Sequence, residues 1–235
     1  MDDGYSIHPG VFEASEMSSA LEAIVAATVA RTKAGARHIL GVPEVSRLAH
    51  DARMLMLAEQ FIGPGPLPFR ATLFDKNPAA NWLVVWHQDT ALPLEKRVDG
   101  REWGPWSTKD GVLYAHAPSW ALEQVVALRI SLDDSTASNG PLRVLPNTHA
   151  RGVMDEGQIS RLVGTITPVE CAVSAGGVVG MRPLIVHGSS KATDDQPRRV
   201  LHIEYSRSRT LGPGIELAIA RQAEGESRHD TYSRH

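Results

Sequence analysis

Hydrophobic and polar positions along the chain change their period near residue 63. Between residues 17 and 39, apolar residues and alanines recur at helical spacing, and a second helical pattern runs from 43 to 61, where Pro43 suits a first helical turn. The Gly-Pro-Gly-Pro run at 63–66 would end any helix. We therefore expect residues 1–66 to form a helical part with two helices.

After residue 66 the pattern becomes that of β-strands. Short apolar or alternating runs are separated by clusters of Gly, Pro, Asn and Asp, and these runs cover residues 69–74, 82–86, 125–132, 142–145, 178–186, 200–205 and 215–219. Many short strands with turn signals between them are typical of a sandwich or barrel. The sequence predicts a mainly β fold, a jelly roll over residues 67–220 with the two N-terminal helices packed on it.

Two segments depart from this pattern. Residues 95–120 hold Trp103, Trp106 and Trp120 among Gly and Pro, and the segment is too long for a turn, so we expect a functional lid that closes over substrate. The polar residues 221–235 are expected to form a flexible tail. A length of 235 residues suits one domain, here taken as 1–235.

Composition and charge narrow the classes of function. The net charge of -3, with no basic run, leaves no excess of Lys and Arg for a phosphate backbone, so we expect no nucleic-acid partner. The single cysteine, Cys171, excludes an internal disulfide and multi-cysteine zinc sites, and it fits a reducing cytoplasm. The acidic start and the lack of an apolar run of about 20 residues argue against export and membrane insertion. The oligomeric state is left open.

The first candidate for chemistry is the pair His87 and Asp89. Side chains two positions apart on a strand point to the same face, so an imidazole and a carboxylate can meet at one point. One more histidine would complete the two-histidine, one-carboxylate set that leaves three positions open on a non-haem Fe(II). The pair alone is weak evidence, because this composition gives roughly one His-x-Asp/Glu by chance and the chain has two.

Residues downstream separate the two pairs. The strand-like run 178–186 ends at His187, and Arg198 follows eleven residues later at the start of another expected strand. After the second pair, His202 and Glu204, the only histidines are two in the polar tail. The second pair is therefore expected to be structural or to line a pocket.

At these motifs the sequence resembles the phytanoyl-CoA dioxygenase family, within the 2-oxoglutarate oxygenases that share a double-stranded β-helix. The matching segments lie between residues 69 and 207 and are Trp86-His87-Gln88-Asp89, residues 132–149 (LDDSTASNGPLRVLPNTH), His187-Gly188-Ser189 and Pro197-Arg198-Arg199.

The resemblance implies an activity and a set of site residues. His87, Asp89 and His187 match the iron ligands, Arg198 matches the arginine that pairs with the distal carboxylate of 2-oxoglutarate, and Ser189 matches a supporting hydroxyl. A guanidinium can grip a carboxylate with two parallel hydrogen bonds. The implied cofactors are Fe(II), 2-oxoglutarate and O2. The implied reaction releases succinate and CO2 and hydroxylates a C–H bond of a small molecule.

Several assignments stay open on the sequence alone. Arg199 competes for the role of carboxylate anchor, because a slip of one residue exchanges the faces of a strand. Asn81 could reach the cosubstrate or cap a strand, and Gln88, Arg143 and Trp106 could meet substrate or be packed or solvated. The alternative functions are a non-catalytic metal-binding jelly-roll protein and a metal-dependent cupin-like enzyme that does not use 2-oxoglutarate.

Overall fold

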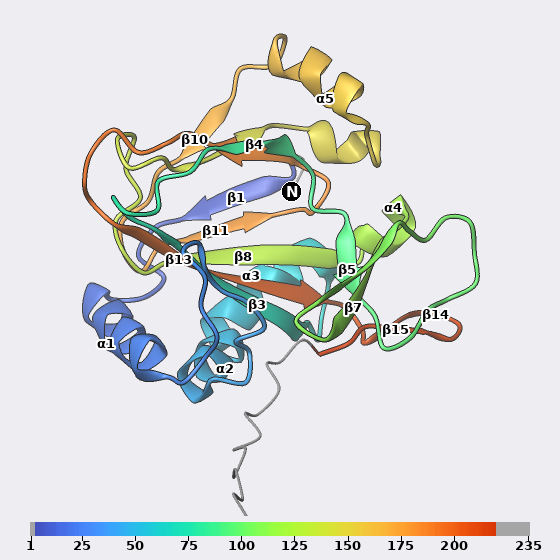
Figure 1. The fold of residues 1–235 in the computed structure, drawn as a ribbon, viewed down its shortest axis with the longest axis horizontal. Coiled ribbons are helices and arrows are strands. Elements are labelled where there is room, and N and C mark those ends of the chain that lie inside the picture. Colours follow the sequence, from blue (N-terminus) through green and yellow to red (C-terminus); the bar gives the residue numbers. More distant parts are fainter. Residues whose placement is uncertain (1–2, 220–235) are drawn as a thin grey trace, which may run out of the picture.

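Two antiparallel β-sheets face each other across the interior of the protein (Figure 1). The fold is given by a computed structural model that describes residues 3–219. In spatial order the larger sheet contains β1 (Tyr5–His8), β11 (Val178–Met181), β8 (Val125–Ser131), β13 (Arg198–Ser206), β3 (Leu67–Lys76) and β2 (Gly35–Ala36). The smaller sheet contains β10 (Val169–Cys171), β9 (Leu142–Leu145), β12 (Val186–Ser189) and β4 (Val84–His87). The expected mainly β jelly roll is confirmed.

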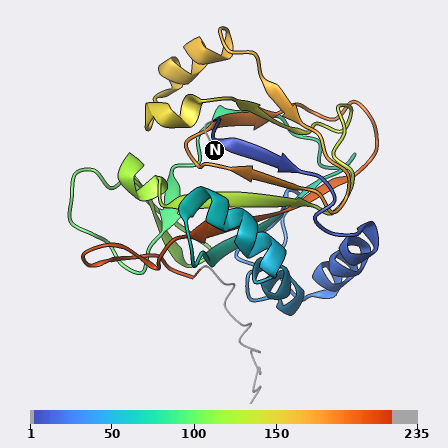
Figure 2. The ribbon, with the colours of Figure 1, turned by 180° about the vertical axis from the view of Figure 1, so that it is seen from behind.

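Three helices cover the outer face of the larger sheet, and Figure 2 shows α3 lying across it. They are α1 (Ala14–Ala26), α2 (Pro43–Ala49) and α3 (Ala52–Ile62). Alternate side chains of β13, Leu201 and Ile203 among them, join the helices in one apolar core. Because side chains alternate along a strand, the positions between them point into the space between the sheets.

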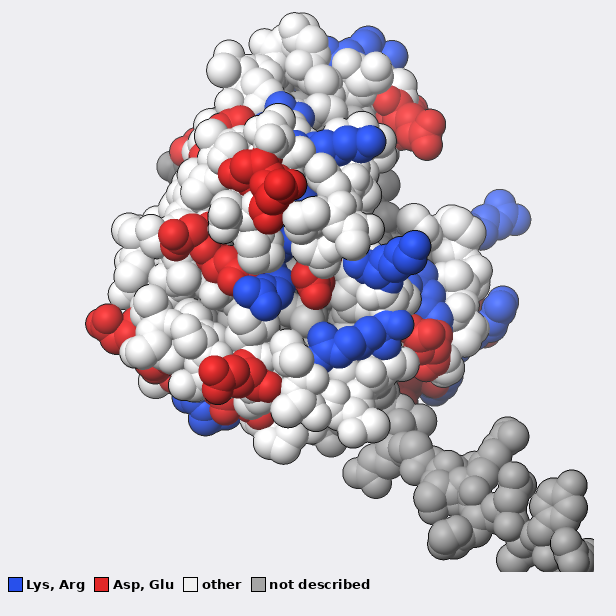
Figure 3. Space-filling view, turned by 60° about the vertical axis from the view of Figure 1, so that its left-hand side comes forward, with Lys and Arg blue, Asp and Glu red and all other residues white. Residues whose placement is uncertain are grey.

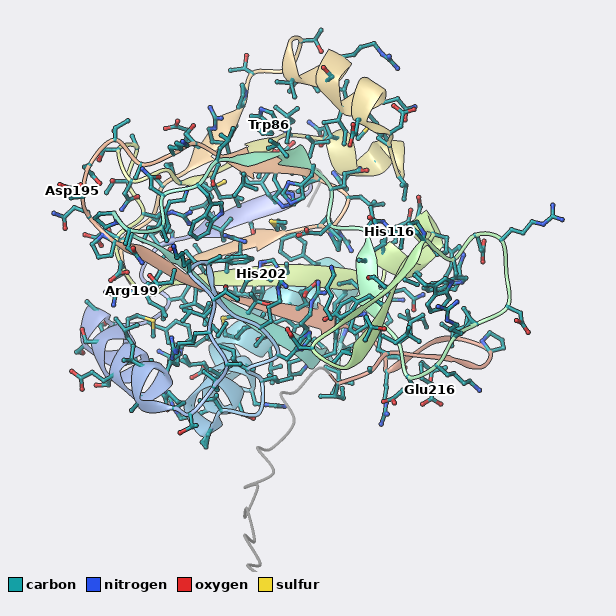
Figure 4. The ribbon with its side chains drawn as sticks, viewed as in Figure 1. Trp86, His116, Asp195, Arg199, His202 and Glu216 are labelled. Carbon is teal, nitrogen blue, oxygen red and sulfur yellow. The ribbon has the colours of Figure 1, made fainter. Side chains whose placement is uncertain are left out.

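The outer face of the smaller sheet is covered by α5 (Glu156–Val163). Trp86 and Val186 from the sheet pack with Ile159 from the helix, and Figure 4 labels Trp86 on this side of the sheet. Both sheets therefore carry an apolar outer layer, and part of the space between them is filled by a second apolar cluster that includes Val144 of β9 and Val179 of β11.

The remaining elements lie at one end of the two sheets. They are a three-stranded sheet of β5 (Ala91–Pro93), β7 (Val112–His116) and β6 (Trp106–Lys109), the pair β14 (Thr210–Gly212) and β15 (Ile215–Glu216), the helix α4 (Ser119–Leu122) and a 3-10 turn at Thr148–Arg151.

The segment 95–120 is more regular than the sequence indicated. It contains the β6–β7 hairpin, which is joined to the rest of the protein through β5. Trp103 is only 5% exposed and packs edge-on against Trp120, with ring centroids 5.9 Å apart. Trp103 is thus buried against its neighbours, whereas Trp120 is 38% exposed, and closure of the segment over substrate stays a prediction.

Both N-terminal helical patterns differ from their expected bounds. The first helix runs from Ala14 to Ala26, and the chain beyond it reaches the sheet as β2 (Gly35–Ala36). The second pattern is divided at Asp51, whose extended backbone breaks the helix and whose carboxylate accepts a hydrogen bond from the Arg53 amide as an N-cap. A helical period alone did not reveal either break.

The run 178–186 was also predicted wrongly as one strand. Residues Val178–Met181 form β11 in the larger sheet and Val186–Ser189 form β12 in the smaller one, so the chain changes sheet between them. His187 therefore lies within a strand and not at its end. The expected tail, 221–235, lies outside the described residues. Within residues 3–219, the helices are too short or too polar to cross a membrane.

The contact of α3 with the larger sheet depends on Gly180. A Cβ atom at this position would lie 2.7 Å from the Phe61 ring and 2.9 Å from the Ser6 hydroxyl. We predict that Gly180→Ala lowers the free energy of unfolding by about 1–3 kcal/mol, because the buried ring has to move. Urea denaturation would measure this loss.

Gly164→Ala is the matched control. Gly164 has a φ of -82°, and the nearest atom to an added Cβ is 3.9 Å away. Its free energy of unfolding should change by less than about 0.5 kcal/mol. Equal stability of the two variants would contradict the close packing of α3 on β11.

Candidate functional site

Two histidines and an aspartate converge between the two sheets. His87 on β4 and His187 on β12 are directly paired across the smaller sheet, and Asp89 follows two residues after His87. The Nε2 atoms of His87 and His187 each lie 3.5 Å from a different carboxylate oxygen of Asp89. All the potential ligand atoms are within 4.8 Å of one another. Three ligand groups can therefore reach one ion.

Backbone carbonyls orient both imidazole rings. The Nδ1 of His87 is 2.7 Å from the carbonyl oxygen of Val85, and the Nδ1 of His187 is 2.9 Å from that of Ile185. Since a carbonyl can only accept, each Nδ1 carries the hydrogen and donates it. This leaves the Nε2 lone pairs facing Asp89, which is the arrangement that a metal ligand needs.

The protonation states also suit a metal. Burial alone would raise the pKa of Asp89, but the neighbouring imidazoles of His187 and His87 hold it well below its usual range. Burial lowers the pKa of His187 to about 4. Burial works to lower the pKa of His87, but the hydrogen bond and charge of Asp89 outweigh it, so this pKa is raised. The Asp89 carboxylate and the neutral His187 imidazole are donors that suit divalent iron, and a metal ion would displace a proton from His87 on binding.

Two buried cationic side chains lie side by side on neighbouring strands of the larger sheet. Arg198 on β13 and Lys76 on β3 are direct cross-strand partners, 4% and 1% exposed. Lys76 donates to the Ser189 hydroxyl at 3.2 Å and to the Ser190 carbonyl at 2.6 Å, whereas the Nε of Arg198 reaches only the Asn139 carbonyl at 3.4 Å. Neither cation meets a carboxylate among the residues that the structure describes.

Their pKa values reflect this lack of an anion. Burial, followed by the charge of Arg129, lowers the pKa of Arg198 to about 10. Burial, followed by the charge of Arg198, lowers the pKa of Lys76 to about 8. Burying two like charges together is costly unless a counter-ion joins them. An anion placed between the two side chains would therefore be stabilised by both charges.

The neighbouring arginine points the other way. Arg199 donates to both carboxylate oxygens of Asp133, at 2.7 Å each, and Figure 4 labels it near the start of β13. The structure therefore places Arg198 in the cavity and Arg199 outside it.

The triad and Arg198 line a cavity of about 210 Å³, and Lys76 adjoins it through its hydrogen bond to Ser189, which is also part of the lining. Its floor is the inner face of the larger sheet, where Arg70 pairs with Glu204 across the strands and Arg129 pairs with His202. Arg70 holds Glu204 through two hydrogen bonds, and Arg129 is 2.9 Å from the Nδ1 of His202. His202, labelled in Figure 4, thus lines the cavity together with Glu204.

Gln88 does not line the cavity, because it lies between His87 and Asp89 and its side chain takes the opposite direction. Its amide group donates to the Gly152 and Leu184 carbonyls and accepts from the Met154 amide. Through these bonds the Gln88 side chain connects the end of β4 to the backbone at residues 152–154 and at Leu184.

Asn81, Arg143 and Trp106 are also outside the cavity lining. Asn81 exchanges two hydrogen bonds with the backbone of Ala192. Arg143 pairs in register with Gly188, so it faces outward, where its guanidinium lies 5.1 Å from the centroid of the Trp86 ring. The centroid of the Trp106 ring lies 5.4 Å from the Cζ atom of Arg97, whose guanidinium stacks over the ring. Their geometry gives no support to a role with substrate or cosubstrate.

Lys76 and Arg129 were missed in the sequence. Lys76 is the last residue of β3, which also contains Arg70 and Asp75, and Arg129 lies within the largely apolar β8. Charged residues are rarely buried without a partner, so a charge inside a predicted core strand could have identified both as site candidates.

Sequence and structure comparisons agree with this geometry. L-proline trans-4-hydroxylase from Streptomyces griseoviridis is 29% identical over 191 residues, which are 69% of this chain and 62% of that protein, so the chain spans about three fifths of its length. The fold is similar to the apo crystal structure of EctD from S. alaskensis, with a TM-score of 0.65, 20% identity and coverage of 95% of this chain and 82% of that one. It is also similar to HygX from Streptomyces hygroscopicus with nickel and 2-oxoglutarate bound, with a TM-score of 0.64, 17% identity and coverage of 89% and 85%.

The family model described as phytanoyl-CoA dioxygenase (PhyH) matches residues 1–200. This match spans the helical part, both sheets and every member of the triad. The chain belongs to the phytanoyl-CoA dioxygenase family.

Proposed function

We propose that the protein is an Fe(II)- and 2-oxoglutarate-dependent oxygenase that hydroxylates a C–H bond of a small molecule. The observation that carries this proposal is that the His87, Asp89 and His187 triad and Arg198 line one cavity, with Lys76 bonded to the lining residue Ser189 behind it. A metal site and a buried anion site side by side are what a metal-chelating dicarboxylate requires.

The triad would hold the iron on one face and leave three positions for the cosubstrate and O2. Bound iron and 2-oxoglutarate would supply the oxidising power for hydroxylation, with succinate and CO2 as the other products. The carbonyl groups of Val85 and Ile185 keep both rings turned toward the ion, so the ligands are oriented before it arrives.

Arg198 would bind the distal carboxylate of 2-oxoglutarate. Lys76 adds a second positive charge next to it and also fixes the Ser189 hydroxyl, which lines the cavity. Burial of these groups strengthens their interaction with an anion, since little water screens the charges. The alternative functions, a relic metal site or an enzyme that does not use 2-oxoglutarate, would have no need for this cation pair.

A small substrate fits the size of the site. The cavity volume of about 210 Å³ lies below the roughly 300–1,000 Å³ of pockets for drug-sized ligands. The relative that hydroxylates L-proline supports a substrate of amino-acid size. We further propose a cytoplasmic location, with a small molecule as the partner.

The direct test is anaerobic addition of Fe(II) and then 2-oxoglutarate. Chelation by both groups of 2-oxoglutarate is expected to give a visible charge-transfer band at one iron per chain. Iron binding without such a band, together with no detectable affinity for 2-oxoglutarate, would overturn the proposal.

For the metal ligands, we predict that His187→Ala and Asp89→Ala each lose most of the bound iron. Removing a group that merely supports a metal ligand costs about 10- to 100-fold in affinity, so loss of a ligand should cost at least as much. Iron content after dialysis would measure the loss. His116→Ala is the control, because His116 lies on β7 outside the cavity lining. Equal iron content in all three variants would refute the assignment.

For the carboxylate anchor, we predict that Arg198→Ala weakens 2-oxoglutarate binding by one or more orders of magnitude while sparing iron. A buried carboxylate would lose a charge-assisted partner worth about 2–5 kcal/mol. Titration of the charge-transfer band would give the affinity.

Arg199→Ala provides the comparison at the next position. It removes the ion pair with Asp133 and should leave the affinity for 2-oxoglutarate unchanged. A loss in Arg199→Ala without one in Arg198→Ala would show that the anchor has been assigned to the wrong residue.

A further inference from the structure

Positive charge is concentrated in the lining of the cavity. Five lining residues are Arg or Lys (Arg37, Arg70, Lys109, Arg129 and Arg198), and only two, Asp89 and Glu204, are acidic. The whole chain nevertheless carries a net charge of -3. Figure 3 shows several Lys and Arg side chains lying close together near the middle of one face. The excess is therefore local to the cavity.

The proposed cofactors do not account for all of this charge. Glu204 neutralises Arg70 through its two hydrogen bonds. Fe(II), Asp89, 2-oxoglutarate and Arg198 together would be neutral. Lys109 and Arg129 then have no counter-charge in the cavity lining, and Lys76 adds to the positive side. A further anion would be stabilised there.

Lys109 lies away from the cation pair, on the wall that the hairpin forms. It ends β6, and its Nζ is 5.1 Å from the centroid of the Tyr114 ring. The Tyr114 hydroxyl is 2.7 Å from the Nε2 of His38, which is 1% exposed. Burial, followed by the charges of Arg70 and Arg37, lowers the pKa of Lys109. Lys109 is an exposed residue that lines the cavity, so this wall presents a positive charge to a ligand that enters.

We infer that the substrate carries a carboxylate and that Lys109 binds this group at the hairpin side of the cavity. The inference rests on the proposed function, since it concerns the second ligand of the same cavity. A lysine ammonium offers three donors and no acceptor, so it selects an anion over a neutral amide of the same shape. Arg129, on the floor, supports the same charge preference. The hairpin therefore determines the class of substrate.

Calorimetry with matched carboxylate and carboxamide probes tests this inference. The protein would be loaded with redox-inert Ni²⁺ and saturated with 2-oxoglutarate, so that Arg198 is occupied and no turnover occurs. The probe pairs are L-proline and L-prolinamide, L-leucine and L-leucinamide, and hexanoate and hexanamide. We expect the tightest probe to be a carboxylate that binds at least about tenfold more tightly than its amide, with a preference that declines as salt rises.

Lys109→Gln should remove this preference, whereas Lys96→Gln should keep it. Lys96 is an exposed lysine of the same segment and does not line the cavity. The inference is overturned if no carboxylate is preferred, if no probe binds, or if both variants behave alike. It is also overturned if Lys109→Gln lowers the affinity for 2-oxoglutarate instead, because the charge then serves the cosubstrate.

The outcome separates the two proposals. If 2-oxoglutarate fails to bind and the carboxylate preference still depends on Lys109, the oxygenase proposal fails and the anion site stands. If 2-oxoglutarate binds normally and no preference is found, the oxygenase proposal stands and the substrate class is wrong.

Discussion

The alternation of side chains along the strands of the larger sheet is the constraint on which the site depends. On β13, Leu201 and Ile203 point to the helices, whereas Arg198, His202 and Glu204 point to the smaller sheet. The apolar half of each strand binds the helices and supplies hydrophobic stabilisation, and this fixes the register of the polar half. The same packing that holds the fold together thus positions the charged groups.

Burying so many charges is tolerated because most of them are partnered. Arg70 with Glu204 and Arg129 with His202 are pairs across neighbouring strands, so the sheet itself sets their geometry. An unpartnered buried charge is costly. Arg198 and Lys76 lie side by side with no carboxylate partner among the described residues, so an anion bound between them would stabilise the pair.

The parts of the fold that local sequence determines were predictable. His87 and Asp89 were identified as a pair from their spacing of two, although β4 ends at His87 and Asp89 lies just beyond it, and the strand 142–145 was found with its true bounds. The choice of Arg198 over Arg199 came from resemblance, because the periodicity does not distinguish adjacent residues at a strand start. The change of sheet between Met181 and Val186 was missed because both strands are apolar and the break between them is short.

The hairpin wall depends on contacts that the sequence does not display. Lys109 reaches the cavity because β7 pairs with both β5 and β6, and Tyr114 meets His38 from a segment 76 positions away. No local sequence pattern predicts this contact between Tyr114 and His38. The metal and cosubstrate residues lie on the two main sheets or, for Asp89, just beyond the end of β4, whereas Lys109, which would bind the substrate carboxylate, comes from the hairpin. Segments outside the main sheets can change with less effect on the core than the strands that carry the triad. This division would let one oxidising centre serve different substrates, with the charge of the wall, and not the metal site, selecting among them.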